Sequence, residues 1–75
     1  MKLGDVMKNV QISGEYITLG QFLKKVNIIS SGGIAKDYLI DNEVYVNNEL
    51  EQRRGRKLYK DYIIEVKNIG VYKID

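Results

Sequence analysis

The sequence contains no cysteine and no histidine. The chain can therefore form neither a disulfide nor the ligand sets that zinc usually takes in proteins. Its stability must come from packing, for which an apolar share of 44% is ordinary. The absence of cysteine also fits a reducing cytoplasm.

Long apolar runs are missing as well. No stretch approaches the roughly 18 consecutive apolar residues that a membrane-spanning helix needs. The N-terminus carries Asp5 and Lys8 where a signal peptide would need an unbroken apolar run. We therefore expect a cytoplasmic protein with one small domain over residues 1–75, whose core is modest in size.

Catalytic chemistry has few candidates in this chain. Without histidine or cysteine, only carboxylates, lysines and tyrosines remain for acid–base work. Asp41 and Glu43 are two residues apart, but we expect one to end a helix and the other to begin a strand. The run S-G-G-I-A-K lacks the Gly-Lys-Ser/Thr ending and the preceding strand of a phosphate-binding loop. We expect no enzyme, no catalytic residue, no cofactor and no metal.

The positive charge is concentrated in one segment. Arg53, Arg54, Arg56 and Lys57 fall within five positions, and the rest of the chain has eight basic and ten acidic residues. A focused positive patch on a slightly acidic body attracts polyanions. We expect this segment, with Gly55 in it, to be an exposed loop, in which charge reversal would leave the fold intact. The alternative is a solvated turn that protects a sheet edge from aggregation.

The clearest helix runs from Thr18 to Val26. Thr18 and Gln21 have the spacing of a capping box. Gly20 in the first turn is a weak helix former, and close packing is our explanation for it. Apolar residues recur at i, i+3, i+4 and i+7, which predicts a face directed at the core. They are Leu19, Phe22, Leu23 and Val26.

A second helix is predicted over about residues 33–41. Ser30 or Ser31 could accept a hydrogen bond at its N-cap. Gly32 and Gly33 leave the first turn bare, and free N–H groups at such a helix start attract phosphate. Lys36, one turn further along, would add a full positive charge.

Other residues extend this candidate nucleic-acid site. Lys24 and Lys25 lie on the polar side of the first helix, close in sequence to the second. Among the tyrosines, Tyr45 and Tyr59 are candidates for stacking on bases. The phosphate-ready helix start and the basic loop together favour nucleic-acid binding.

The rest of the chain is predicted to form strands. Residues 44–47 and 49–51 should pair across Asn47 and Asn48, which tolerate positive φ. Residues 62–66 and 71–74 should form a terminal hairpin, and residues 9–12 alternate like a strand. The fold class is α+β, with two helices packed on a small, mostly antiparallel sheet of four to five short strands.

Two runs carry a resemblance to a known family, namely S-G-G-I-A-K-D-Y-L-I-D-N-E-V-Y-V-N-N and, behind it, R-R-G-R-K-L-Y-K-D-Y-I-I-E-V. Together they resemble the S-four-type RNA-binding domain, named after the fourth protein of the small ribosomal subunit. The match covers about Thr18 to Val66. With S-G-G at the helix start and R-R-G-R-K after the hairpin, the chain is similar to a small stand-alone bacterial branch, the YaaA/YbcJ-like proteins.

The resemblance implies the αL motif, in which two helices and an adjoining hairpin hold structured RNA. It also implies a cytoplasmic protein that binds ribosomal RNA or acts in ribosome assembly, with no membrane or small-molecule substrate involved. Many members have an arginine where this chain has Gly32, so more of the RNA contacts are expected from the basic loop. The implied RNA-binding residues are Ser31, Gly32, Gly33, Lys36, Arg53, Arg54, Arg56 and Lys57, with Lys24 and Lys25 matched by charge alone.

A rival interpretation is an adaptor that docks on an acidic protein through the same basic loop. Charge alone also leaves DNA open as the polyanion. Structured RNA is favoured over both through the family resemblance.

Overall fold

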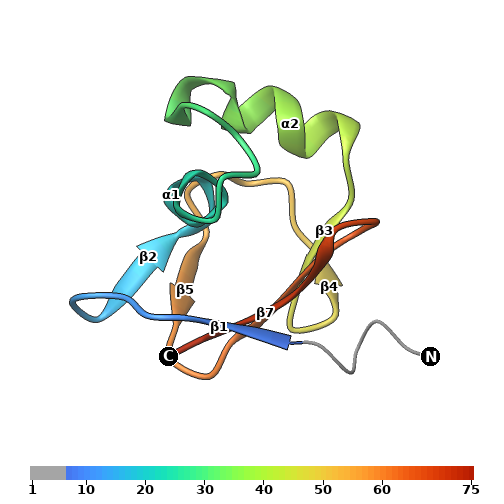
Figure 1. Cartoon of the computed structure of the whole chain (residues 1–75). Helices are drawn as coiled ribbons and strands as arrows, with labels where there is room; N and C mark the ends of the chain where they lie inside the picture. Colours follow the sequence, from blue (N-terminus) through green and yellow to red (C-terminus); the bar gives the residue numbers. More distant parts are fainter. Residues whose placement is uncertain (1–6) are drawn as a thin grey trace.

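A computed structural model describes residues 7–75 of the chain, and the first six residues lie outside the described part. Two α-helices are present there, α1 (Leu19–Lys25) and α2 (Ala35–Asp41), and α2 follows a 3₁₀ turn, η2 (Gly32–Ile34) (Figure 1). Neither helix is long and apolar enough to cross a membrane. The strands in this part of the chain are β1 (Met7–Val10), β2 (Tyr16–Thr18), β3 (Val44–Val46), β4 (Glu49–Leu50), β5 (Lys57–Tyr59), β6 (Ile63–Val66) and β7 (Gly70–Ile74).

The strands form two sheets. The larger has five strands in the order β1-β7-β6-β3-β4, in which β1 pairs with β7 in parallel and the other neighbours are antiparallel. The smaller is the antiparallel ribbon β2–β5, which lies beside α1, while both helices lie on the same side of the larger sheet (Figure 1). The predicted α+β class is confirmed, with more strands than expected because β2 and β5 pair separately.

The first helix starts as the sequence predicts. The backbone N–H of Thr18 donates to Oε1 of Gln21 at 3.0 Å, and the backbone N–H of Gln21 donates to Oγ1 of Thr18 at 3.3 Å. This reciprocal pair is a capping box, and Asn27 ends the segment with a φ of 63°. The predicted apolar face is confirmed, because Leu19, Phe22 and Leu23 are fully buried and Val26 packs against the core.

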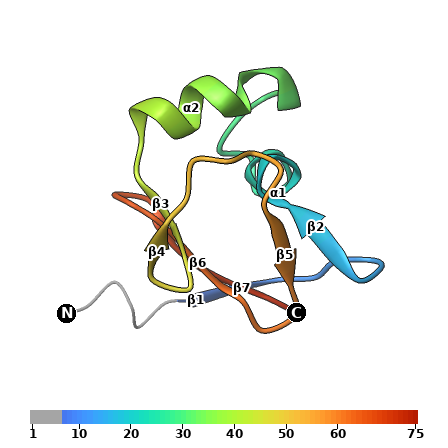
Figure 2. The same ribbon diagram turned by 180° about the vertical axis from the view of Figure 1, so that it is seen from behind.

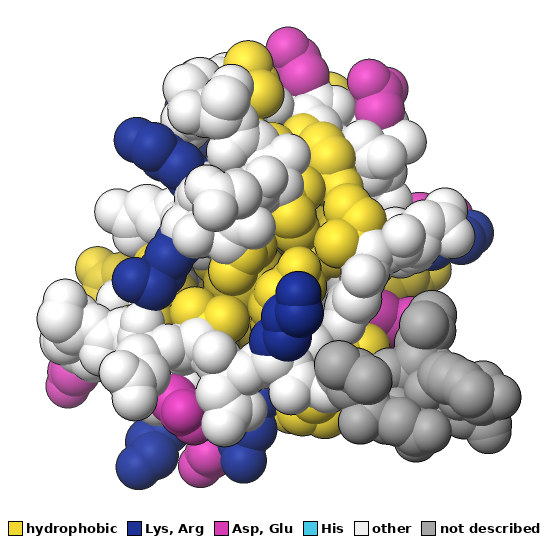
Figure 3. All heavy atoms as spheres, viewed as in Figure 1, with side chains coloured by type: hydrophobic (Ala, Val, Ile, Leu, Met, Phe, Trp, Pro, Cys, Tyr) yellow, Lys and Arg dark blue, Asp and Glu magenta, His cyan; other side chains and the backbone are white. Residues whose placement is uncertain are grey.

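The central hairpin also follows the sequence pattern. Val44 and Val46 are fully buried on β3, and Tyr45 between them is half-buried. Asn47 and Asn48 have φ values of 50° and 71°, as a tight two-residue turn requires. Apolar side chains from the helices and the sheet form one core, part of which reaches the surface below α2 (Figure 3).

The predicted serine cap of the second helix is wrong. Ser31 precedes η2 but its side chain makes no capping hydrogen bond, and α2 itself begins at Ala35. The two glycines instead fold into the 3₁₀ turn, in which Ile34 N–H donates to the Ser31 carbonyl at 3.4 Å and Ala35 N–H donates to that of Gly32. Backbone carbonyl oxygens thus accept the N–H hydrogen bonds that a serine hydroxyl would accept in a serine-capped helix.

Candidate nucleic-acid interface

The basic loop, residues 51–57, follows β4 and ends at the first residue of β5, and it is held against the start of α1 (Figure 2). The prediction that Lys57 is a loop residue is wrong, because it pairs with Thr18 in the β2–β5 ribbon. The N–H of Leu19 donates to the carbonyl of Arg56 at 2.8 Å, and the N–H of Gly20 donates to that of Arg54 at 2.9 Å. These are among the N–H groups that a helix cannot satisfy within its own first turn. The loop therefore completes α1, and α1 in return fixes the backbone path of the loop.

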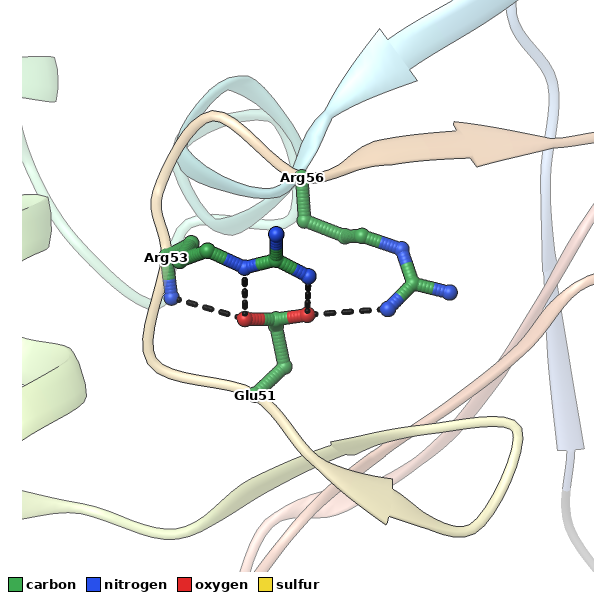
Figure 4. Close-up of polar contacts among 3 residues, drawn as sticks. All are labelled: Glu51, Arg53 and Arg56. Carbon is green, nitrogen blue, oxygen red and sulfur yellow. Dashed lines mark hydrogen bonds and ion pairs between the residues drawn. The ribbon is translucent and has the colours of Figure 1, made fainter.

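A buried carboxylate organises the loop from inside. The side chain of Glu51 is only 7% exposed. Its Oε2 accepts from the backbone N–H and Nε of Arg53 at 3.0 and 2.9 Å, and its Oε1 accepts from Nη2 of Arg53 at 2.9 Å (Figure 4). Nη1 of Arg56 donates to the same Oε1 at 2.8 Å. One carboxylate thus ties together two arginines that are three residues apart.

These hydrogen bonds fix the charge state of Glu51. Donation from the Arg53 side chain, aided by its backbone N–H and by Arg56, lowers the pKa of Glu51 to about 2 although burial opposes the shift. Glu51 is therefore ionised at neutral pH and offsets part of the charge of its two arginines.

The four basic residues of the loop consequently differ in their surroundings. The expectation of a fully exposed loop is wrong for Arg56, whose side chain is 23% exposed, whereas Arg53 is 75% exposed. Replacing both Arg53 and Arg56 with glutamate would place three carboxylates together and disturb the fold. Arg54 and Lys57 are exposed and belong to none of the ion pairs of residues 7–75, so no carboxylate there offsets their charges.

Gly20 on α1 lies against both parts of the predicted site, the start of α2 and the basic loop. A Cβ atom on Gly20 would lie 3.4 Å from Cβ of Ala35 and 3.4 Å from the carbonyl oxygen of Arg54. Ala35 is the first residue of α2, and Lys36 beside it is exposed. The close packing predicted at Gly20 is confirmed, and it brings the start of α2 and the basic loop to the same end of α1.

The tightness of this junction can be tested by substitution. We expect Gly20→Val to lower the free energy of unfolding by about 1–3 kcal/mol, because the extra methyl groups overpack the contact. Gly20→Ala should change it by less than about 1 kcal/mol, since one Cβ fits and alanine favours the helix. Urea unfolding measures both, with Lys24→Val as the control at an exposed position of the same helix. Equal stability of the Gly20→Val and Lys24→Val variants would contradict the close contact.

The remaining predicted site residues are open to solvent. Ser31, Gly32, Gly33 and Lys36 are exposed, and nothing lies within 4 Å of a Cβ built on Gly32. The packing therefore does not require a glycine there. Lys24 and Lys25 line an open groove of about 590 Å³, together with Gln21 and Tyr16.

The two predicted stacking tyrosines lie in different surroundings. The hydroxyl of Tyr45 donates to Oε1 of Glu43 at 2.6 Å, a bond that raises the pKa of Tyr45 and lowers that of Glu43. Glu65 and Lys67 line the same hollow, so Tyr45 lies near two carboxylates and one lysine. Tyr59 lies beside the basic loop, where its ring contacts that of Tyr16. Tyr16 is not among the predicted site residues, because it comes to lie beside Tyr59 only when β2 pairs with β5.

Comparison with known proteins agrees with this architecture. A family model described as S4 domain matches residues 10–75. The chain is also 48% identical over 65 residues to the "Probable ribosome maturation protein RlbA" of Bacillus subtilis (strain 168). That alignment covers 87% of this chain and 92% of the Bacillus protein.

Proposed function

Because the chain belongs to the S4 domain family, we propose that it binds structured RNA and catalyses no reaction on it. The observation that carries the proposal is the fixed basic loop, in which Arg54 and Lys57 face solvent from a backbone anchored on α1. A preformed cationic loop attracts phosphates and loses little conformational freedom when it binds them.

The proposed contact surface extends from the loop across the two helices. Arg54, Lys57 and the outer edge of Arg53 contact phosphates on one side, and Lys36 does so at the start of α2. The exposed turn of Ser31, Gly32 and Gly33 lets the RNA backbone approach closely. Arg56 acts mainly by holding Glu51, and Lys24 and Lys25 add charge at the groove beside α1. Such a surface reads shape and phosphates more than base sequence.

We propose ribosomal RNA as the partner and ribosome assembly in the cytoplasm as the setting. Support comes from the Bacillus relative, whose name describes a ribosome maturation protein and which this chain matches over 92% of its length. The cationic loop fits this role, since folded ribosomal RNA presents dense phosphate at its surface.

A salt titration tests the proposal. The wild-type protein is titrated with a folded ribosomal RNA fragment at several salt concentrations, and with a DNA duplex and poly-L-glutamate in parallel. Contacts with four to six phosphates should make log K fall with log salt at a slope of about −4 to −5. We expect the RNA to be preferred over both competitors. Preference for the DNA duplex, or poly-L-glutamate binding that RNA fails to displace, would contradict RNA binding as the function.

A further inference from the structure

The β2–β5 ribbon has one inner and one outer face. Ile17 pairs with Leu58 in the ribbon, and their side chains pack toward the core. Tyr16 pairs with Tyr59, one position along each strand. Because side chains alternate across a strand, both tyrosines lie on the outer face.

These rings form a continuous aromatic strip, which consists of Tyr16, Tyr59 and Tyr62. The ring centroids of Tyr16 and Tyr59 are 5.8 Å apart, and those of Tyr59 and Tyr62 are 5.6 Å apart. Tyr16 is 41% and Tyr59 39% exposed. Tyr62 is partly buried against the core, so the strip is anchored at one end and open at the other.

Positive charge lies directly beside the aromatic strip. Nζ of Lys57 lies 4.9 Å from the centroid of the Tyr16 ring, and Cζ of Arg56 lies 5.9 Å from that of Tyr62. Tyr16 also lines the groove that carries Lys24 and Lys25. The strip and the basic loop are therefore adjacent parts of one surface, in contrast to Tyr45, which faces Glu43.

We propose that the aromatic strip stacks an unpaired nucleobase of the RNA whose phosphates the basic loop contacts. Every base has a flat π-face, so tyrosine rings bind it with little sequence preference. Bases in a continuous A-form duplex are stacked on one another and cannot reach such a strip. The protein would therefore prefer sites at which an RNA helix opens into a loop, bulge or single strand. This inference rests on the proposed RNA-binding function.

The test compares two RNAs that share one stem, a hairpin with an unpaired loop and a blunt duplex. Tyr16→Ala and Tyr59→Ala should each lower affinity for the hairpin on the order of tenfold, and affinity for the duplex by less than about twofold. The salt slope of Tyr59→Ala should stay unchanged, because this variant removes neither a phosphate contact nor the Tyr16 ring beside Lys57. Tyr16→Phe and Tyr59→Phe keep the stacking face and should bind the hairpin like the wild type. Tyr45→Ala is the control at a tyrosine outside the aromatic strip.

Two further measurements separate stacking from a structural role. Tyr59→Leu keeps apolar bulk without an aromatic face, so it should lose hairpin affinity like Tyr59→Ala while unfolding like the wild type. 2-Aminopurine in the loop should be quenched by the wild type and not by the leucine variant. Two results would overturn the stacking site and leave RNA binding intact. One is that the alanine and leucine variants keep the preference for the hairpin, and the other is that the wild type binds hairpin and duplex equally. Failure of the wild type to bind either RNA would overturn both.

Discussion

The Arg54→Glu, Lys57→Glu double variant should bind structured RNA about 100-fold more weakly than the wild type. A hydrogen bond to a charged group contributes about 1.5–3 kcal/mol, so losing two costs at least about 3 kcal/mol, or two powers of ten. Both side chains are exposed and make no ion pair within residues 7–75, so the fold should tolerate the change. The salt slope should fall by about 2, one for each lost phosphate contact.

A variant of equal net charge supplies the control. Lys8 on β1 and Lys67 after β6 are exposed residues outside the basic loop, and Lys67 makes only a 3.5 Å pair with exposed Glu43. The Lys8→Glu, Lys67→Glu variant should lose much less affinity if binding depends on the loop. Equal losses in the two double variants would show that net charge alone governs binding, and would contradict the assigned surface.

Replacing Glu51 with glutamine should weaken both the fold and RNA binding, although it removes a negative charge and so raises the net charge of the protein by one. Glutamine cannot balance the charges of Arg53 and Arg56, and its amide cannot accept all four hydrogen bonds that reach the carboxylate. We expect the free energy of unfolding to fall by about 2–4 kcal/mol. RNA affinity should fall by roughly tenfold because the loop is no longer held in place.

Glu49→Gln is the matched control, since it changes net charge equally at an exposed position two residues away. Simple charge attraction predicts that both glutamine variants bind RNA more tightly, and such a result would refute the organising role of Glu51. In the wild type, the contribution of Glu51 should be complete above about pH 4.5. It should be lost as pH falls toward 2, because the folded protein holds the pKa below its ordinary value. Unfolding measured across this range should show a larger loss in the wild type than in Glu51→Gln, in which the loss due to Glu43 remains.

Local patterns were sufficient to predict the elements whose side chains repeat regularly. The capping box at Thr18 and Gln21, the apolar face of α1 and the Asn47-Asn48 turn all depend on residues close together in the chain. The family was recognised from two motifs that span most of the sequence. The family model that matches residues 10–75 confirms that recognition.

Features that depend on contacts between residues far apart in the sequence were not predicted. Glu51 looks like an ordinary strand carboxylate until the loop folds over it, and the outer face of the β2–β5 ribbon exists only after residues 16 and 59 pair. The serine cap failed for a related reason, since two glycines allowed a 3₁₀ turn that satisfies the backbone without a side chain. Which residues contact RNA remains a prediction, now ordered by exposure, with Arg54 and Lys57 ahead of Arg56.

The pairing of β1 with β7 has a consequence for how the chain is made. Among the strands of residues 7–75, β1 pairs in the larger sheet only with β7, which is the last of them in the sequence. During synthesis β1 therefore waits without a strand partner until β7 has left the ribosome. Contacts so far apart in sequence make folding slow to start and cooperative once it begins. The complete larger sheet should therefore form only after β7 has been made and has become free to pair.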